Sequence, residues 1–423
     1  MQTWERPQVP LLPGSAPTLQ LRDSLTGAIS PHLREELNLW VCGITPYDAT
    51  HLGHANTYVF FDILVRVWID GGRKMRYAQN LTDIDDPLFE RAHATGVDWK
   101  NLAHEQTELF RQDMRELRVI PPHAWVSVSE KLDDLEQLVR AWEENAGAYR
   151  LPNDDGSEDI YVDSASDVEF VNSPYFSDLD LAALFDGHGG DSQRVGKRNP
   201  LDPLVWKGVR GTDYRPPSKI AGQWRPGWHI ECAAIAKDEL GTVDVQGGGS
   251  DLLFPHHEMS ELHLRAINSQ ESAVATLAQQ KSVAFHVHSA MVSYQGTKMS
   301  KSLGNLILVS QLIHTGVDPR AIRLTILSHH YRQDWEYTDA VLERAQKRLA
   351  QWNAALEAPF DECAPEHGME LLQKLRKNLA YDLDTPAALA AVDDCLAHLT
   401  AWHSEADKQL VIDTIDALLG VKL

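Results

Sequence analysis

Two histidines flank a glycine where an apolar run ends and a helical pattern begins. His51, Gly53 and His54 follow the apolar residues 37–44 after a short turn. A glycine at the start of a helix lets the backbone approach a phosphate, and the helix N-terminus favours negative charge. The two imidazoles can donate hydrogen bonds to a phosphoryl group as charge develops on it. Taken alone, this short histidine motif (residues 50–54) also fits two ordinary surface histidines.

A second motif, the sequence KMSKS at residues 298–302, lies on a polar stretch between a strand pattern and a helix pattern. The two lysines of this lysine motif, Lys298 and Lys301, can close over a triphosphate and stabilise the transition state and the leaving pyrophosphate. The alternative is a solvated basic loop. Because the histidine motif occurs in the same chain, the combination favours binding of a nucleoside triphosphate.

Cysteine and histidine residues form a third candidate site. Cys42 lies near the end of the first apolar run, Cys232 follows the segment RPGWHIE, and His256 and His257 follow GGGSDLLFP. Thiolate and imidazole are donors that Zn²⁺ prefers, and a catalytic zinc commonly keeps three protein ligands and one open position. Spacing alone leaves an equal alternative, in which the two cysteines are buried apolar residues.

The elements that must position these residues alternate between strand and helix patterns. Residues 37–44 predict a buried strand, residues 58–72 a helix and residues 74–82 a second strand. This alternation predicts an α/β fold with a parallel, doubly wound sheet. Such sheets bind nucleotides at the carboxyl ends of their strands, where the histidine motif and Cys42 are expected.

The remaining segments differ in character along the chain. Residues 100–150 predict helices, and residues 151–200, rich in Asp, Gly and Ser, predict a loop-rich insertion. Strand patterns return at LDPLVWK, GTVDVQGGGSDLLF and VAFHVHSAMVSYQ. After residue 317 we expect mainly helices to the end.

Charge and composition limit the function classes. The formal net charge of -22 argues against a nucleic-acid partner, because proteins that bind a phosphate backbone carry a local basic excess. No apolar run reaches the roughly 20 residues that cross a bilayer, and the N-terminal residues lack the pattern of a secretory signal. The 4 cysteines are widely spaced, which argues against a disulfide framework. We therefore expect a cytoplasmic protein without a membrane segment.

The motifs VCGITPYD, NLTDIDD, RPGWHIECAA, GGGSDLLFPHHE and KMSKSLGN occur in the order found in cysteinyl-tRNA synthetases. Residues 37–340 thus resemble this class I aminoacyl-tRNA synthetase family. The resemblance implies a Rossmann-like (HUP) catalytic core with an inserted connective domain and a C-terminal α-helical domain. It also assigns Cys42, Cys232 and His256 to a zinc ion, which would favour cysteine because the hydroxyl of serine is a poor zinc ligand.

The chain departs from the synthetase pattern at several positions. Residues 256–260 read His-His-Glu-Met-Ser where the synthetases read His-His-Glu-Asn-Glu, so the fourth protein ligand is missing. An i,i+2 relation to His256 on a helix disfavours Glu258 as a replacement. Residues 51–56 read HLGHAN in place of the usual HIGNAR, and residues 85–87 read Asp-Asp-Pro in place of Asp-Asp-Lys.

The largest departure lies after the catalytic core, where we expect too few residues for a domain that reads a tRNA. At the positions where it departs from the synthetases, the chain resembles the cysteine ligases of mycothiol biosynthesis. This family is related to the synthetases and joins L-cysteine to the amine of glucosaminyl-inositol. Residues 187–192 read Gly-His-Gly-Gly-Asp-Ser where that family often reads Glu-Arg-Gly-Gly-Asp-Pro, which leaves the role of this loop open.

The resemblance implies a reaction in two steps, through cysteinyl-AMP, with one Zn²⁺ per chain and with ATP accompanied by Mg²⁺. His51, His54, Lys298 and Lys301 would be catalytic. The residues implied for the cysteinyl-adenylate are Cys42, Gly43, Ile44, Thr45, Thr57, Asn80, Leu81, Thr82, Trp228, Gly249, Ser250, Asp251 and Val292. We expect a monomer that acts on L-cysteine, ATP and glucosaminyl-inositol.

Two other functions stay open at this point. One is a cysteinyl-tRNA synthetase with a reduced tRNA-binding region, and the other is a non-catalytic synthetase paralogue. The expected organisation is an irregular extension at 1–30, a catalytic domain from 31–120 and 200–284, an inserted region at 121–199, a region around the lysine motif at 285–345, and a helical domain at 346–423.

Overall fold

The computed structural model describes residues 1–32, 34–208, 218, 220, 223–271, 282–299 and 304–423. Its central sheet consists of β3 (Glu36–Ile44), β4 (Lys74–Leu81), β5 (Ala124–Ser127), β10 (Val243–Gly249) and β11 (Val283–Ser289). These strands are parallel and lie in the order β11-β10-β3-β4-β5. The strand of this sheet that comes first in the chain, β3, lies in the middle and later strands add to both sides, so the prediction of a doubly wound sheet is confirmed.

Alternate residues of β3 belong to different hydrophobic cores. The helices that cover the two faces are α1 (Leu52–Asp70), α6 (Trp228–Leu240) and α7 (Glu258–Glu271). Leu39 and Val41 belong to the hydrophobic core that includes α1. Trp40 and Cys42 belong to the second core, which includes α6 and α7. Successive strand side chains point to opposite faces of a sheet. Cys42 therefore points toward the helix that carries Cys232.

Helix α1 begins at the histidine motif and crosses the sheet. Its N-cap is His51, whose side chain accepts a hydrogen bond from the backbone amide of Gly53 at 3.1 Å. The helix is buried along most of its length because the sheet covers one side and C-terminal helices cover the other. At its centre Asp62 pairs with Arg66 at 2.6 Å and also with Arg323, so these buried charges compensate one another.

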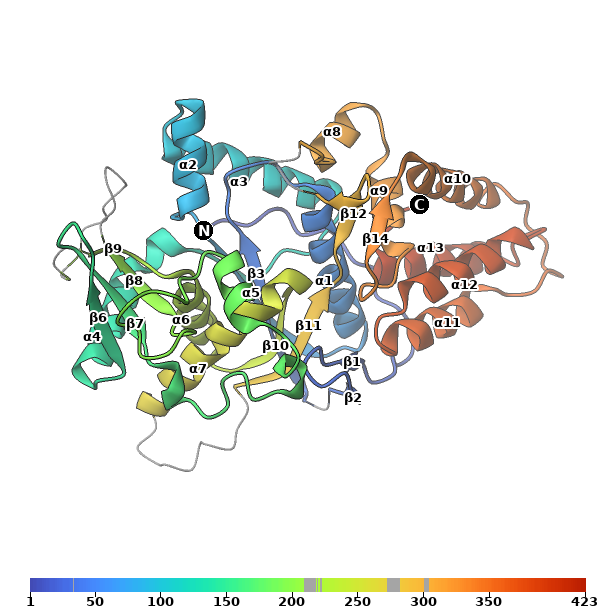
Figure 1. Cartoon of the computed structure of the whole chain (residues 1–423). Coiled ribbons are helices and arrows are strands. Elements are labelled where there is room, and N and C mark those ends of the chain that lie inside the picture. The colour runs from blue at the N-terminus through green and yellow to red at the C-terminus, as the bar shows by residue number, and fades with distance from the viewer. Residues whose placement is uncertain (33, 209–217, 219, 221–222, 272–281, 300–303) are drawn as a thin grey trace.

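The chain between β4 and α6 contains an inserted sheet, drawn in green at the left of Figure 1. Besides β5, this stretch of the chain contains α2 (Asp86–Thr95), α3 (Trp99–Glu116), α4 (Leu132–Glu144), β6 (Ala148–Pro152), β7 (Glu158–Val162), α5 (Leu181–Gly187), β8 (Leu204–Gly208) and β9 (Gln223–Pro226). Strands β6, β7, β8 and β9 pair antiparallel in this order.

The structure differs from the expected organisation of this segment in two places. The prediction of helices alone over residues 100–150 was wrong, because β5 and β6 lie there and are too short to show a period of two. Strands β8 and β9 pair within the inserted sheet although they lie beyond residue 199, the expected end of the insertion. The domain boundaries themselves stay predictions.

After β11 the chain forms a small sheet and then mainly helices, as expected. The sheet has the order β13-β12-β14 and consists of β12 (Val292–Tyr294), β13 (Thr297–Lys298) and β14 (Trp335–Tyr337). The helices are α8 (Val309–His314), α9 (Pro319–Leu327), α10 (Asp339–Ala355), α11 (Gly368–Ala380), α12 (Thr385–Ala397) and α13 (Glu405–Leu419). Helices α10 to α13 gather at the right of Figure 1.

The N-terminal extension is irregular up to the antiparallel pair β1 (Gln20–Arg22) and β2 (Ile29–Pro31). It is nevertheless attached to the core. Trp4 is buried and its Nε1 donates to the carbonyl oxygen of Val119 at 2.7 Å. Ser24 donates its backbone amide to the carbonyl oxygen of His286 on β11 at 2.7 Å. None of the helices in the described part of the chain combines the length and apolar character needed to cross a bilayer.

Candidate active site

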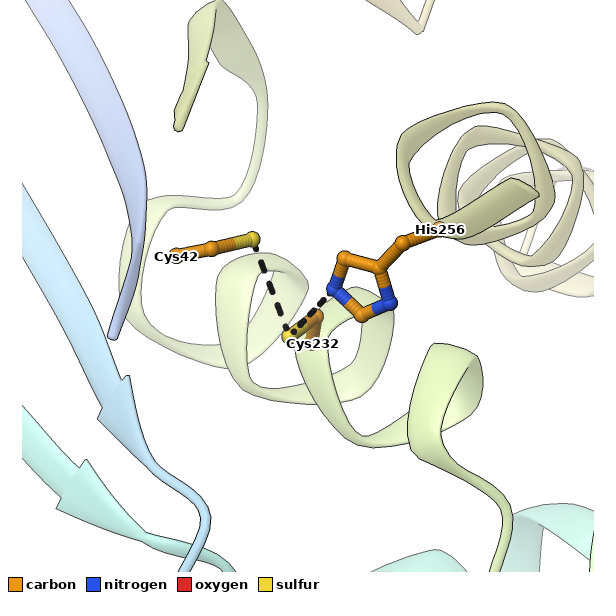
Figure 2. Close-up of side chains that lie close together, drawn as sticks. All are labelled: Cys42, Cys232 and His256. Carbon is orange, nitrogen blue, oxygen red and sulfur yellow. Dashed lines mark hydrogen bonds between the residues drawn. The ribbon is translucent and has the colours of Figure 1, made fainter. Parts of the chain in front are cut away.

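Cys42, Cys232 and His256 meet beside the carboxyl end of β3 (Figure 2). Each offers one ligand atom, and these atoms all lie within 4.8 Å of one another. The two Sγ atoms are 3.9 Å apart, and Nε2 of His256 lies 3.3 Å from Sγ of Cys232. All three side chains are buried. The fold thus brings together three residues that are widely separated in the chain.

Burial determines the protonation of this cluster. Burial raises the pKa of the Cys232 thiol well above its ordinary value, and the neighbouring Cys42 raises it further. Burial also lowers the pKa of His256 well below its ordinary value, so its imidazole is neutral. A neutral imidazole keeps a lone pair for a metal, and a divalent cation stabilises the thiolates that apolar surroundings disfavour. Two thiols and one imidazole around a common point fit a metal site of the zinc type.

Further histidines surround these donors. Nδ1 of His229 lies 3.1 Å from Nδ1 of His256, on the ring edge away from Cys232. His257 instead places Nε2 3.1 Å from Sγ of Cys42 and Nδ1 2.7 Å from Nε2 of His288. A hydrogen bond to the second ring nitrogen commonly orients a metal-binding histidine. His229 occupies that position for His256.

Trp228 and Glu258 lie close to His256, Trp228 in space and Glu258 in the chain. The ring of Trp228, at the start of α6, stacks on that of His256 with centroids 4.0 Å apart and planes at 23°. The carboxylate of Glu258 accepts a hydrogen bond from the backbone amide of Val171 at 2.7 Å. Glu258 therefore faces the inserted segment.

Several residues expected to bind the cysteinyl group lie at the carboxyl ends of β3 and β4. The backbone amide of Gly43 donates to Oδ1 of Asn80 at 2.8 Å, and Nδ2 of Asn80 donates to Oγ1 of Thr82 at 2.9 Å. A Cβ at Gly43 would lie 1.7 Å from the carbonyl oxygen of Asn80, so glycine is required here. The other predicted residues on these strand ends are Ile44 and Leu81, which are buried, and Thr45, which is half-buried.

Thr57 and the end of β10 lie along the same edge of the sheet. Oγ1 of Thr57 lies 2.7 Å from Oγ of Ser289, the last residue of β11. Gly249 pairs with Ser289 in the sheet, and a Cβ on this glycine would lie 2.6 Å from Oδ1 of Asp251. Gly249 and Asp251 are half-buried and Ser250 is exposed. The expected nucleotide-binding residues thus lie level with the ends of the parallel strands.

The histidine motif presents its two rings together at the start of α1. The rings of His51 and His54 stack with centroids 3.8 Å apart and planes at 25°. Both residues are half-buried. Next to them, the backbone amide of Leu52 donates to the carbonyl oxygen of Ile307 at 2.8 Å. The histidine motif is thus bonded to the segment that follows the lysine motif.

The lysine motif is described only in part. Lys301 lies outside the described residues, and so does the side chain of Lys298, whose backbone ends β13. Met299 between them is buried in the core that contains α1. Val292, expected near the adenine, is buried on β12, the neighbour of β13. The roles of the two lysines stay predictions.

The acidic pair that stands near a lysine position of the synthetases is engaged in ion pairs. Arg225 of β9 lies 3.5 Å from Asp85 and 2.5 Å from Asp86, and Lys207 of β8 also pairs with Asp86. These contacts join the start of α2 to the inserted sheet.

Sequence reasoning missed part of the site. It assigned no role to His229, His286, His288 or Ser289, and it placed His257 beside His256 without making it a metal ligand. A signal was present, because His286 and His288 alternate with apolar residues on a predicted strand and therefore share one face. No local pattern, however, indicates which helix that face meets.

The chain matches the family of class I tRNA synthetases (C), catalytic domain, over residues 28–347. It is 48% identical to the L-cysteine:1D-myo-inositol 2-amino-2-deoxy-alpha-D-glucopyranoside ligase of Cellulomonas flavigena and 47% identical to that of Kineococcus radiotolerans, with 100% of both chains covered in each case. A solved structure of Mycobacterium tuberculosis methionyl-tRNA synthetase bound by methionyl-adenylate has a similar fold, with a TM-score of 0.60 at 14% identity over 90% of this chain and 92% of that chain.

Proposed function

We propose that this chain, which belongs to the L-cysteine:1D-myo-inositol 2-amino-2-deoxy-alpha-D-glucopyranoside ligases, joins L-cysteine to the amine of glucosaminyl-inositol with consumption of ATP. In the first step the carboxylate of cysteine attacks the α-phosphate of ATP, which forms cysteinyl-AMP and releases pyrophosphate. In the second step the 2-amino group of the glucosaminide attacks the mixed anhydride, forms the amide, loses a proton and expels AMP.

The observation that carries the proposal is the position of two thiols and an imidazole beside the strand ends of a nucleotide-binding fold. Cys42, Cys232 and His256 would hold one Zn²⁺ per chain, and the ion would select the thiolate of the substrate cysteine over the hydroxyl of serine. His229 would orient the ring of His256 through the contact between their Nδ1 atoms. Trp228 would cover the cluster and border the amino group of the substrate.

The histidine motif and the lysine motif would contact the phosphates of ATP. His51 and His54 lie at the N-terminus of α1, where the helix dipole favours the negative charge of a phosphate. Their imidazoles would stabilise the transition state at the α-phosphate. Lys298 and Lys301 would bind the leaving pyrophosphate together with Mg²⁺, which arrives with ATP.

The cysteinyl and adenosine groups would lie along the carboxyl edge of the sheet. Gly43 and Asn80 would line the cysteinyl pocket, because their hydrogen bond holds the carboxyl ends of β3 and β4 together at this edge of the sheet. Gly249 and Asp251 would meet the ribose. The remaining residues proposed for the adenylate are Ile44, Thr45, Thr57, Leu81, Thr82, Ser250 and Val292.

We further propose a monomeric, cytoplasmic enzyme that does not bind nucleic acid. The formal net charge of -22 supports the last point, because binding to a phosphate backbone requires a basic surface.

One assay tests the acceptor. The chain is incubated with L-cysteine, ATP and Mg²⁺, and with either glucosaminyl-inositol or tRNA, and AMP and acylated products are measured by mass spectrometry. We expect the amide of cysteine and glucosaminyl-inositol, with AMP and pyrophosphate in equal amounts, and no cysteinyl-tRNA. Stable cysteinyl-tRNA without turnover of the aminoglycoside would instead identify a synthetase with a reduced tRNA-binding region. No AMP formation with either acceptor would identify a non-catalytic paralogue.

A further inference from the structure

One side chain joins the two described stretches that flank the lysine motif. Nδ2 of Asn305 donates to Oγ1 of Thr297 at 3.0 Å and to the carbonyl oxygen of Tyr294 at 3.3 Å. Asn305 is buried, with 7% of its surface exposed. We propose that Asn305 is a positioning residue for adenylation, which holds together the two ends of the segment that carries Lys298 and Lys301. This inference rests on the proposed function.

The first end of that segment is a defined hairpin. Tyr294 pairs with Thr297 across β12 and β13, and the turn between them places Gln295 and Gly296 at φ values of 55° and 74°. The backbone amide of Gly296 donates to Oε1 of Glu336 on β14 at 2.7 Å. The two acceptors of Asn305 therefore belong to a rigid turn, since strand pairing and the contact to β14 both restrain it.

The second end is bonded to the histidine motif. Two residues after Asn305, the carbonyl oxygen of Ile307 accepts from the backbone amide of Leu52 at 2.8 Å. The backbone amide of Val309 donates in turn to the carbonyl oxygen of Thr50 at 3.1 Å. The residues that follow the lysine segment are therefore hydrogen-bonded to both sides of His51.

The hairpin is also attached to α1. Nδ2 of Asn56 donates to the carbonyl oxygen of Ala290 at 3.1 Å, and Nε1 of Trp335 donates to Oδ1 of Asn56 at 3.2 Å. Ala290 precedes β12, and Trp335 lies on β14, the partner of β12. Both ends of the lysine segment thus rest on the first turns of α1, and Asn305 joins one end to the other.

This arrangement explains why an asparagine serves at residue 305. The amide nitrogen carries two hydrogens, and Thr297 and Tyr294 present a hydroxyl and a carbonyl oxygen to it as acceptors. An aspartate of the same shape cannot donate to a carbonyl oxygen. Without the link, the hairpin and the stretch that begins at Asn305 are no longer held to each other beside His51 and His54. A misplacement of about 1 Å far from the reacting atoms can lower a rate about 10²-fold.

The test uses cysteine-dependent exchange of pyrophosphate into ATP, which reports adenylation without the acceptor. We expect Asn305→Ala and Asn305→Asp to lower kcat for exchange by about 10- to 100-fold, with KM for cysteine and zinc content unchanged. Thr297→Val removes one acceptor and should give a smaller loss. Thr297→Ser keeps the hydroxyl, so its exchange rate should stay close to that of the unaltered chain.

Two results in the variants would overturn the inference. One is an unchanged kcat in Asn305→Ala. The other is a loss of exchange accompanied by lower zinc content, higher KM for cysteine and a lower Tm, since this combination indicates a general role in folding. Absence of exchange in the unaltered chain would overturn the proposed function and this inference together, whereas exchange that is insensitive to residue 305 would overturn the inference alone.

Discussion

The Sγ atoms of Cys42 and Cys232 lie 3.9 Å apart although 190 residues separate the two cysteines in the chain. Cys42 comes from the carboxyl end of the central strand β3, and Cys232 from the second turn of α6, which packs on that strand. Two buried thiols at this distance are poorly solvated and cannot both ionise without a cation. Their arrangement, with His256 beside them, leads to the first prediction.

We expect about one Zn²⁺ per chain in protein purified without added metal, and a loss of most of it in Cys42→Ala and in Cys232→Ala, because each change removes one of three donors. Elemental analysis by mass spectrometry measures this. Cys363→Ala and Cys395→Ala are the matched controls, since these cysteines lie on exposed and half-buried positions elsewhere, and should keep the metal. Full zinc content in both site variants would contradict the assignment.

Lys301→Ala should lower the rate of pyrophosphate exchange by about 10²- to 10³-fold, the usual effect of removing one positioned charge from a transition state. Zinc content and Tm should stay unchanged, because the lysine is not among the metal donors. Lys377→Ala, at an exposed position on α11, is the control and should exchange normally. Exchange at the unaltered rate in Lys301→Ala would rule out a role of this lysine in adenylation.

Gly43→Ala should destabilise the fold by about 1 to 3 kcal/mol, as overpacking does elsewhere. The added Cβ would lie 1.7 Å from the carbonyl oxygen of Asn80, so β3 and β4 must separate at the site. Urea unfolding measures the change, and exchange should fall with it. Gly187→Ala is the control because a Cβ there meets nothing within 4 Å. Equal stability of both variants would show that the strand ends can adapt.

Stability should depend on pH through His286. Burial by itself lowers the pKa of His286, but hydrogen bonds and charges of Asp23 and Glu261 outweigh it and raise the pKa to about 9. Nε2 of His286 lies 2.9 Å from Oε2 of Glu261, and its Nδ1 lies 3.5 Å from Oδ2 of Asp23. Arg265 pairs with Glu261 from the far side at 3.0 Å.

Because the folded-state pKa of His286 lies above its ordinary value of 6.5, the stabilisation is fully present below pH 6.5 and is lost as the pH rises toward 9. The free energy of unfolding should fall by on the order of 2 to 3 kcal/mol over this range. Urea unfolding at a series of pH values measures it. In His286→Asn this slope should be nearly absent, whereas His398→Asn, at an exposed position on the C-terminal side, should keep it. An identical slope in His286→Asn would refute the assignment.

Much of the fold follows from local patterns. The apolar run around Val41 and the period of α1 predict a strand followed by a helix, because burial on both faces makes a parallel strand apolar throughout. Strands β5, β6 and β14 were not predicted. Each has five residues or fewer, which is too short for a repeat, and pairing with distant strands stabilises it.

By itself the sequence determined which donors are present, that the histidine motif precedes the lysine motif, and that the strand before His51 is buried. Only the tertiary structure decided how these groups meet: that Nε2 of His256 faces Cys232 while the adjacent His257 faces Cys42, and that Leu52 is bonded to Ile307. These contacts depend on the register between parallel strands and on the packing of helices across the sheet. Both arise between segments far apart in the chain, so no local pattern of residues encodes them.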